Sequence, residues 1–138
     1  WTQVRSLEEV DALASRIETV NRKWRNYSTA IGEAMEFSQA QFASAPACDR
    51  QVIDISGDGS SNEGVEPKDA AAELLAAGTT VNALVIEGAA PMLPEYFWEN
   101  VILGPGAGVI TAISFDEYPK RMRMKLLREA SKPGSNLT

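Results

Sequence analysis

The stretch QVIDISGDGSSNEG, residues 51–64, decides the fold. Its first half, 52–56, is a short apolar run typical of a buried strand, and its second half is a loop rich in glycine and oxygen-bearing side chains. A proline at position 67 then begins a helical pattern. Open α/β folds place their ligand sites where a strand ends in such a loop. We therefore predict that Asp58 lies at the carboxyl edge of a central strand and points at a metal ion or polar ligand.

The rest of the chain alternates helical and strand patterns around this stretch. The periodicity predicts helices over about 7–20, 30–44, 67–78, 95–101 and 115–130, and strands over 79–86 and 109–113. A strand, a crossover helix and a second buried strand favour a parallel βαβ unit. We expect an α/β fold of three-layer, Rossmann-like type with a mostly parallel sheet. At 138 residues the chain fits one domain, with 131–138 as a tail.

Several helices carry recognisable start signals and apolar stripes. Serine followed three residues later by glutamate, at Ser6 and again at Ser114, is the pattern of a capping box. Gly32 at the second helix start is expected to let another loop approach closely. The side chains predicted to face the core are Leu7, Val10, Leu13, Ala14, Ile17, Ile31, Ala34, Met35, Ser38, Phe42, Tyr118, Met122, Leu126 and Leu127.

Two further groups of side chains are assigned structural roles. The aromatic pair Trp24 and Tyr27, in a polar connector, is predicted to cover the edge of the core. The basic residues of the last helix are predicted to form its solvent-exposed face; they are Lys120, Arg121, Arg123, Lys125 and Arg128. Asp54 lies inside the strand, where a lone carboxylate is costly to bury. We expect it to accept hydrogen bonds from a loop or helix start near Thr29.

Composition excludes several classes of function. The net charge of −6 argues against nucleic-acid binding, and no apolar run is long enough to cross a bilayer. Cys48 is the single cysteine and histidine is absent, so the usual zinc sites and histidine-based triads are excluded. Any metal must be bound by oxygen ligands, which suits magnesium, manganese or calcium.

Two readings of the focal loop meet clear obstacles. From Asp58 the pattern D-G-S-S-N-E resembles a calcium loop, but an EF-hand needs glycine at position six and glutamate at position twelve. Those positions hold Glu63 and Asp69. The segment Gly57-Asp58-Gly59 with Asn62-Glu63 also resembles the late acidic motif of haloacid dehalogenase-like phosphatases. Those enzymes also need a D-x-D after an upstream strand, and this chain has none, which counts against the resemblance. A magnesium-dependent phosphohydrolase is kept as the enzyme alternative.

A third reading uses two segments together. Thr29-Ala30-Ile31-Gly32 opening a helix, and a strand ending Ser-Gly-Asp-Gly, resemble the back half of a von Willebrand factor type A domain. With AAGTTVNAL, the pair Tyr96-Phe97 and VILGPGAGV, the chain from 1 to about 128 resembles an uncharacterised bacterial family of such proteins, a domain of unknown function. The resemblance implies a metal-ion-dependent adhesion site that takes Mg²⁺, Mn²⁺ or Ca²⁺. Thr29 would supply its hydroxyl and Asp58 its carboxylate, with Ser60 and Asn62 at the rim.

The chain departs from the family pattern at the first loop of that site. No D-x-S-x-S follows an apolar strand, so we expect the N-terminal strands, including the central first strand, to be missing from this chain. The remaining strand would then have an unpaired flank, which predicts a homo-oligomer or pairing with the missing part. Two ligands cannot hold a magnesium ion tightly, so no tightly bound metal is expected. The resemblance further implies a non-enzymatic module that binds a protein partner, in an exported or periplasmic protein; a structural scaffold is the remaining alternative.

Overall fold

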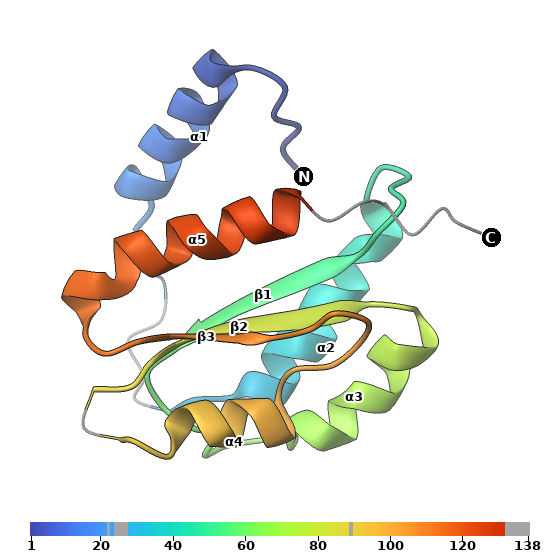
Figure 1. Cartoon of the computed structure of the whole chain (residues 1–138). Coiled ribbons are helices and arrows are strands. Elements are labelled where there is room, and N and C mark those ends of the chain that lie inside the picture. Colours follow the sequence, from blue (N-terminus) through green and yellow to red (C-terminus); the bar gives the residue numbers. More distant parts are fainter. Residues whose placement is uncertain (22, 24–27, 89, 132–138) are drawn as a thin grey trace.

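The computed structural model describes residues 1–21, 23, 28–88 and 90–131. Its helices are α1 (Leu7–Thr19), α2 (Ile31–Gln41), α3 (Pro67–Ala76), α4 (Leu93–Asn100) and α5 (Tyr118–Ala130), with short 3-10 turns at Phe42–Ser44 and Phe115–Glu117. Its strands are β1 (Val52–Gly57), β2 (Thr80–Ile86) and β3 (Val109–Ala112) (Figure 1). The alternation of helices and strands confirms the predicted α/β class. Trp24, Tyr27 and the segment 132–138 lie outside the described residues.

The three strands form one parallel sheet in the order β1-β2-β3. The register runs from Val52↔Thr80 to Gly57↔Val85 in the first pair, and from Ala83↔Val109 to Ile86↔Ala112 in the second. Helix α3 connects β1 to β2, so the predicted parallel βαβ unit is confirmed. Helices α2, α3 and α4 cover one face and α5 covers the other, which gives three layers (Figure 1).

Alternate residues of β2 divide the core between the two faces. Val81, Ala83 and Val85 point toward α2, α3 and α4, where they pack in the larger core. Leu84 and Ile86 point toward α5 and form a smaller cluster with Ala112, Tyr118 and Met122. The members of the larger core are Ile31, Met35, Ile53, Ala70, Leu74, Val81, Ala83, Val85, Leu93, Phe97 and Val101.

One predicted capping box forms and the other does not. The Ser6 hydroxyl accepts from the Glu9 N–H at 3.2 Å and the Glu9 carboxylate accepts from the Ser6 N–H at 3.1 Å, which confirms the first box. The second prediction was wrong. The Glu117 carboxylate accepts from the backbone N–H of Ile113 at 3.1 Å, and a 3-10 turn over 115–117 precedes the helix.

The apolar stripe of α1 is exposed, which corrects the prediction that it faces the core. None of the residues of this helix is buried, and Leu7 is 83% and Ile17 65% exposed. Periodicity shows that a helix is amphipathic but does not supply the surface that covers it. In the described part of the chain, no element packs extensively against α1.

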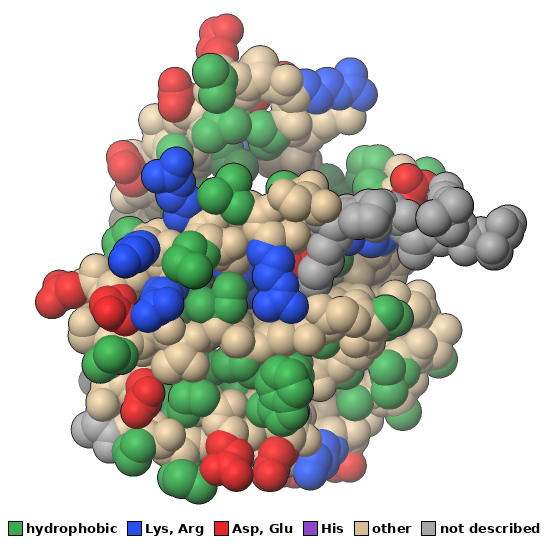
Figure 2. Space-filling view, viewed as in Figure 1, with side chains coloured by type: hydrophobic (Ala, Val, Ile, Leu, Met, Phe, Trp, Pro, Cys, Tyr) green, Lys and Arg blue, Asp and Glu red, His purple; other side chains and the backbone are tan. Residues whose placement is uncertain are grey.

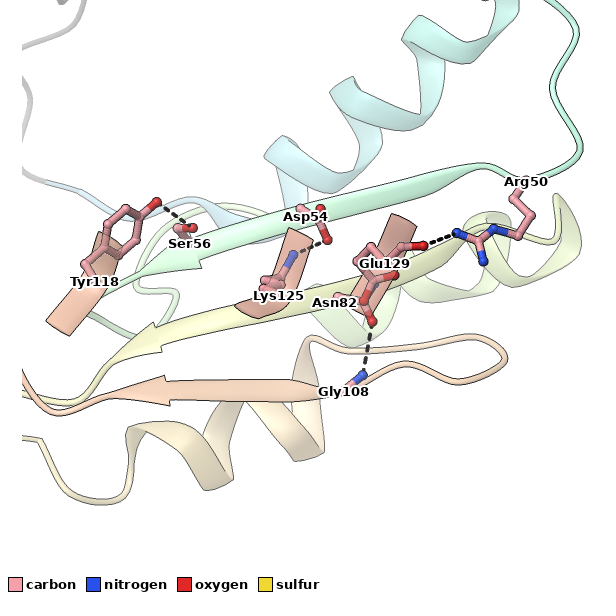
Figure 3. Close-up of polar contacts among 8 residues, drawn as sticks. All are labelled: Arg50, Asp54, Ser56, Asn82, Gly108, Tyr118, Lys125 and Glu129. Carbon is pink, nitrogen blue, oxygen red and sulfur yellow. Dashed lines mark hydrogen bonds and ion pairs between the residues drawn. The ribbon is translucent and has the colours of Figure 1, made fainter. Parts of the chain in front are cut away.

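The basic residues of α5 are exposed as predicted at Lys120, Arg123 and Arg128 and half-buried at Arg121, but Lys125 is buried, which corrects the prediction for that residue. Lys125 is 1% exposed, whereas Leu126 and Leu127, which were predicted to face the core, are 52% and 58% exposed. Lys125 forms an ion pair with Asp54 of β1, and the Tyr118 hydroxyl donates to Ser56 Oγ at 3.1 Å (Figure 3). The prediction that Asp54 bonds near Thr29 was therefore wrong. On the face that α5 covers, β1 carries the polar side chains of Asp54 and Ser56, and α5 contacts them with Lys125 and Tyr118.

Strand β1 lies at an edge of the sheet. Within the described residues β2 is its one strand neighbour, and no strand occupies its other flank. In Figure 1 the strands β1, β2 and β3 follow one another downward, and in this view α5 lies between β1 and α1.

Candidate functional site

The focal loop begins where β1 ends at Gly57, and two glycines near it allow close packing. A Cβ on Gly57 would lie 2.9 Å from Phe97 Cζ of α4. A Cβ on Gly32, at the start of α2, would lie 2.0 Å from the carbonyl oxygen of Val65 in the same loop. The predicted close approach of a loop to the start of this helix is confirmed. Both contacts fix the loop 58–66 against α2 and α4.

Hydrogen bonds join the loop to the segment around Thr29. The backbone N–H of Thr29 donates to Asn62 Oδ1 at 2.8 Å, and the N–H of Asn62 donates to the Thr29 carbonyl at 2.8 Å. Ser61 Oγ donates to the same carbonyl at 3.2 Å and accepts from the Ile31 N–H at 3.2 Å. The segment around Thr29 and the loop that follows β1, which were both predicted to carry site residues, therefore lie side by side.

Ser61 is a site residue that the sequence reasoning missed. Its hydroxyl satisfies the N–H of Ile31 at the start of α2, where the N-cap Ala30 has no side-chain acceptor. Its own N–H donates to the Tyr96 hydroxyl of α4 at 3.2 Å. The absence of Ser, Thr, Asp or Asn at the N-cap was the available signal, because the first turn of α2 then needs an acceptor from elsewhere.

Asp58 borders a cavity of about 260 Å³ at the carboxyl ends of β1 and β2. Its lining residues are Ser56, Gly57, Asp58, Ile86, Phe115 and Tyr118. Asp58, Ser60 and Asn62 are all exposed. Asn62 Oδ1 already accepts a hydrogen bond from the Thr29 N–H. The sequence reasoning assigned Tyr118 to the core and passed over Phe115, because neither lies near Asp58 along the chain.

The chemistry of this edge is that of oxygen donors. The groups offered are a carboxylate (Asp58), hydroxyls (Thr29, Ser60) and an amide (Asn62), which suit a hard cation or a hydrogen-bonding ligand. Within the described residues no lysine or arginine forms an ion pair with Asp58, and no three His, Cys, Asp or Glu side chains group together as a metal cluster. A separate cavity of about 710 Å³ lies at the opposite end of the sheet, lined in part by Gln51, Thr80 and Pro105.

The electrostatics of the same sheet edge include one perturbed carboxyl. The hydrogen bond from the Ile113 N–H lowers the pKa of Glu117 below its ordinary value, and Arg121, whose Nε lies 3.6 Å from the carboxylate, lowers it further. The Glu117 carboxylate thereby links Ile113, directly after β3, to the start of α5.

The fold is that of an α/β protein with a parallel sheet, and Asp58 lies at the carboxyl edge of that sheet, next to the segment that carries Thr29. Residues 1–134 match the model of a family described as a protein of unknown function (DUF1194), and the chain belongs to that family. Comparison with curated proteins and with solved structures found no match. No helix in the described residues has the length and apolar character that crossing a bilayer requires.

Proposed function

We propose that the protein is a non-enzymatic binding module of von Willebrand factor A-like type with a partial metal-ion-dependent adhesion site. Asp58 supplies a carboxylate and Thr29 a hydroxyl to Mg²⁺, Mn²⁺ or Ca²⁺, directly or through water. Ser60 and Asn62 form the rim, where the amide oxygen of Asn62 also holds the Thr29 segment in place. A carboxylate of a protein partner fills a remaining position on the cation.

One observation carries this proposal. The Thr29 segment and the loop that begins at Asp58 are hydrogen-bonded to each other twice at 2.8 Å, through Thr29 and Asn62. These contacts support the proposal because they hold the segment that carries Thr29 against the loop that carries Asp58. The carboxyl edge of a parallel sheet, where that loop begins, is where open α/β folds bind ligands.

The same geometry limits the affinity. Magnesium needs about six oxygen ligands in a near-ideal octahedron, and two side chains leave most positions to water. We expect cation binding by this chain alone to be weak, about millimolar, as in the weakest oxygen-ligated sites. Tight binding then requires the carboxylate of a partner as well.

Titration with Mn²⁺, followed by paramagnetic broadening of amide NMR signals, tests the site directly. We expect broadening centred on residues 29–31 and 57–62, reduced at least several-fold in Asp58→Asn and in Thr29→Ala. Asp11→Asn is the matched control, because Asp11 is an exposed aspartate of α1. Broadening spread evenly over the acidic surface, or unchanged in Asp58→Asn, would refute the site.

The two alternatives give different outcomes. A phosphohydrolase of haloacid dehalogenase type hydrolyses p-nitrophenyl phosphate with Mg²⁺, whereas a binding module leaves it intact. A scaffold without a cation site shows no localised broadening at any Mn²⁺ concentration. Hydrolysis of the phosphoester, or the absence of localised broadening, would each exclude the proposal.

A further inference from the structure

Glu33, in the first turn of α2, holds the returning limb of the loop 58–66. Its Oε1 accepts a hydrogen bond from the backbone N–H of Val65 at 2.7 Å. The neighbouring Gly64 has a φ of 75°, and a Cβ at this position would overlap the Glu33 carboxylate. Glycine therefore lets the chain pass close to this carboxylate. Both contacts lie between α2 and the loop, so they depend on no other element.

The helix and the loop cap each other. Glu33 is the third residue after the N-cap Ala30, the position at which the glutamate of a capping box reaches back to the N-cap N–H. Ala30 has no side-chain oxygen to complete such a box. The loop supplies one, since Ser61 Oγ accepts from the Ile31 N–H at 3.2 Å. Glu33 in turn accepts from Val65 of the loop, so the two halves of a capping box are shared between two segments.

One oxygen of the Glu33 carboxylate is left without a hydrogen bond. Oε2 is buried, and among the described residues it has no hydrogen-bond partner. A buried carboxylate oxygen of this kind loses its hydration without compensation. Stability alone therefore does not favour a glutamate at this position, and such local departures from good packing chemistry are expected at functional sites.

We propose that Glu33 is a positioning residue of the candidate site, an inference that rests on the proposed function for the cation itself. Asp58 lies on a short span between two fixed points, Gly57 against α4 and Ser61 against α2. Glu33 fixes the returning limb of the loop to the same turn of α2, so that Ser61 stays on the Thr29 carbonyl. Asp58 and Thr29 are thereby held in place before a cation binds, which lowers the entropy lost on binding.

Two variants of Glu33 separate its hydrogen bond from its charge. Glu33→Gln keeps an oxygen within reach of the Val65 N–H and loses the charge, whereas Glu33→Asp keeps the charge and is one methylene too short. Glu36→Gln is the matched control, because Glu36 is an exposed glutamate of the same helix. Figure 2 shows Asp and Glu side chains at separate places on the surface, so Mn²⁺ also binds elsewhere, and the control measures that background.

Amide hydrogen exchange tests the loop without any metal. The N–H groups of Ser61 and Asn62 bond to Tyr96 and Thr29 and are not touched by Glu33. Their exchange should rise about ten-fold in Glu33→Asp, through loss of one hydrogen bond that holds the loop, and should stay within about two-fold in Glu33→Gln. Amides of β2 should keep their rates. Unchanged exchange in Glu33→Asp, equal exchange in the two variants, or a rise shared by β2 overturns the proposal.

Titration with Mn²⁺ then links Glu33 to the cation. The concentration that gives half-maximal broadening at residues 57–62 should rise about three-fold or more in Glu33→Asp and stay within about two-fold in Glu33→Gln and Glu36→Gln. No change in Glu33→Asp, or weaker binding in Glu33→Gln than in Glu33→Asp, overturns the proposal. Absence of localised broadening in the unsubstituted protein refutes the proposed function alone, and the exchange rates still decide whether Glu33 positions the loop.

Discussion

The ion pair between Lys125 and Asp54 gives the sharpest prediction on stability. The Lys125 side chain is 2% exposed and that of Asp54 is 34% exposed, so the two partners are not equivalent. Asp54→Asn keeps the shape of the side chain but leaves the buried ammonium without its counter-charge. Breaking a fully buried pair in this way costs about 3–5 kcal/mol. Because water reaches the position of Asp54, we expect a smaller loss, about 2–3 kcal/mol.

The converse change should cost much less. Lys125→Met replaces the buried ammonium by an apolar group of similar length and leaves Asp54 partly hydrated, so we expect a change within about 1 kcal/mol. The double variant Asp54→Asn/Lys125→Met should then resemble Lys125→Met, because the unpaired charge is gone.

Urea unfolding followed by circular dichroism measures these free energies, and Asp11→Asn serves as the exposed control. Measurements at two protein concentrations separate the ion pair from any effect on association. The reasoning is refuted if Asp54→Asn costs no more than Lys125→Met, or if the two single changes simply add in the double variant.

Two further predictions concern the glycine contact and the titrating carboxyl. Gly32→Ala should destabilise the fold by about 1–3 kcal/mol in urea unfolding, because its Cβ would lie 2.0 Å from the Val65 carbonyl. Gly59→Ala, whose Cβ meets nothing within 4 Å, should be close to neutral, and equal effects would contradict the packing argument. The pKa of Glu117 should lie below the ordinary glutamate value of about 4.3 by NMR titration. Its contribution to stability is present above that value and is lost as the pH falls through the lowered pKa; an unshifted titration would contradict the Ile113 hydrogen bond.

The parts of the fold that sequence predicts best are those fixed by local chemistry. Strand β2 is almost continuously apolar because both faces are covered, and Pro67 and Gly78 mark the limits of α3 because each suits its backbone position. Gly78 has a φ of 74°, which glycine adopts without strain. These signals depend on a few neighbouring residues and need no knowledge of the tertiary fold.

The parts that sequence missed depend on distant partners. Lys125 is buried because Asp54 lies beneath it, and a periodicity that counts lysine as polar places it outside. The exposed stripe of α1 looks the same in sequence as a covered one. At the candidate site, Asp58 follows from the strand and loop pattern. The role of Ser61 follows from the contact between two loops, which the spacing of residues along the chain does not contain.

The order β1-β2-β3, which matches the order along the chain, bears on how the molecule folds. Each strand pairing spans only one intervening helix, so its loop-closure entropy is small for a parallel sheet. The contacts of α5 with β1 and the residues just before it are more remote, since Tyr118 and Ser56 are 62 residues apart and the Arg50 contact with the Glu129 carbonyl spans 79. We expect the unit from β1 to β2 to form the folding nucleus and α5 to dock late. Substitutions beneath α5 should then accelerate unfolding and leave the folding rate almost unchanged.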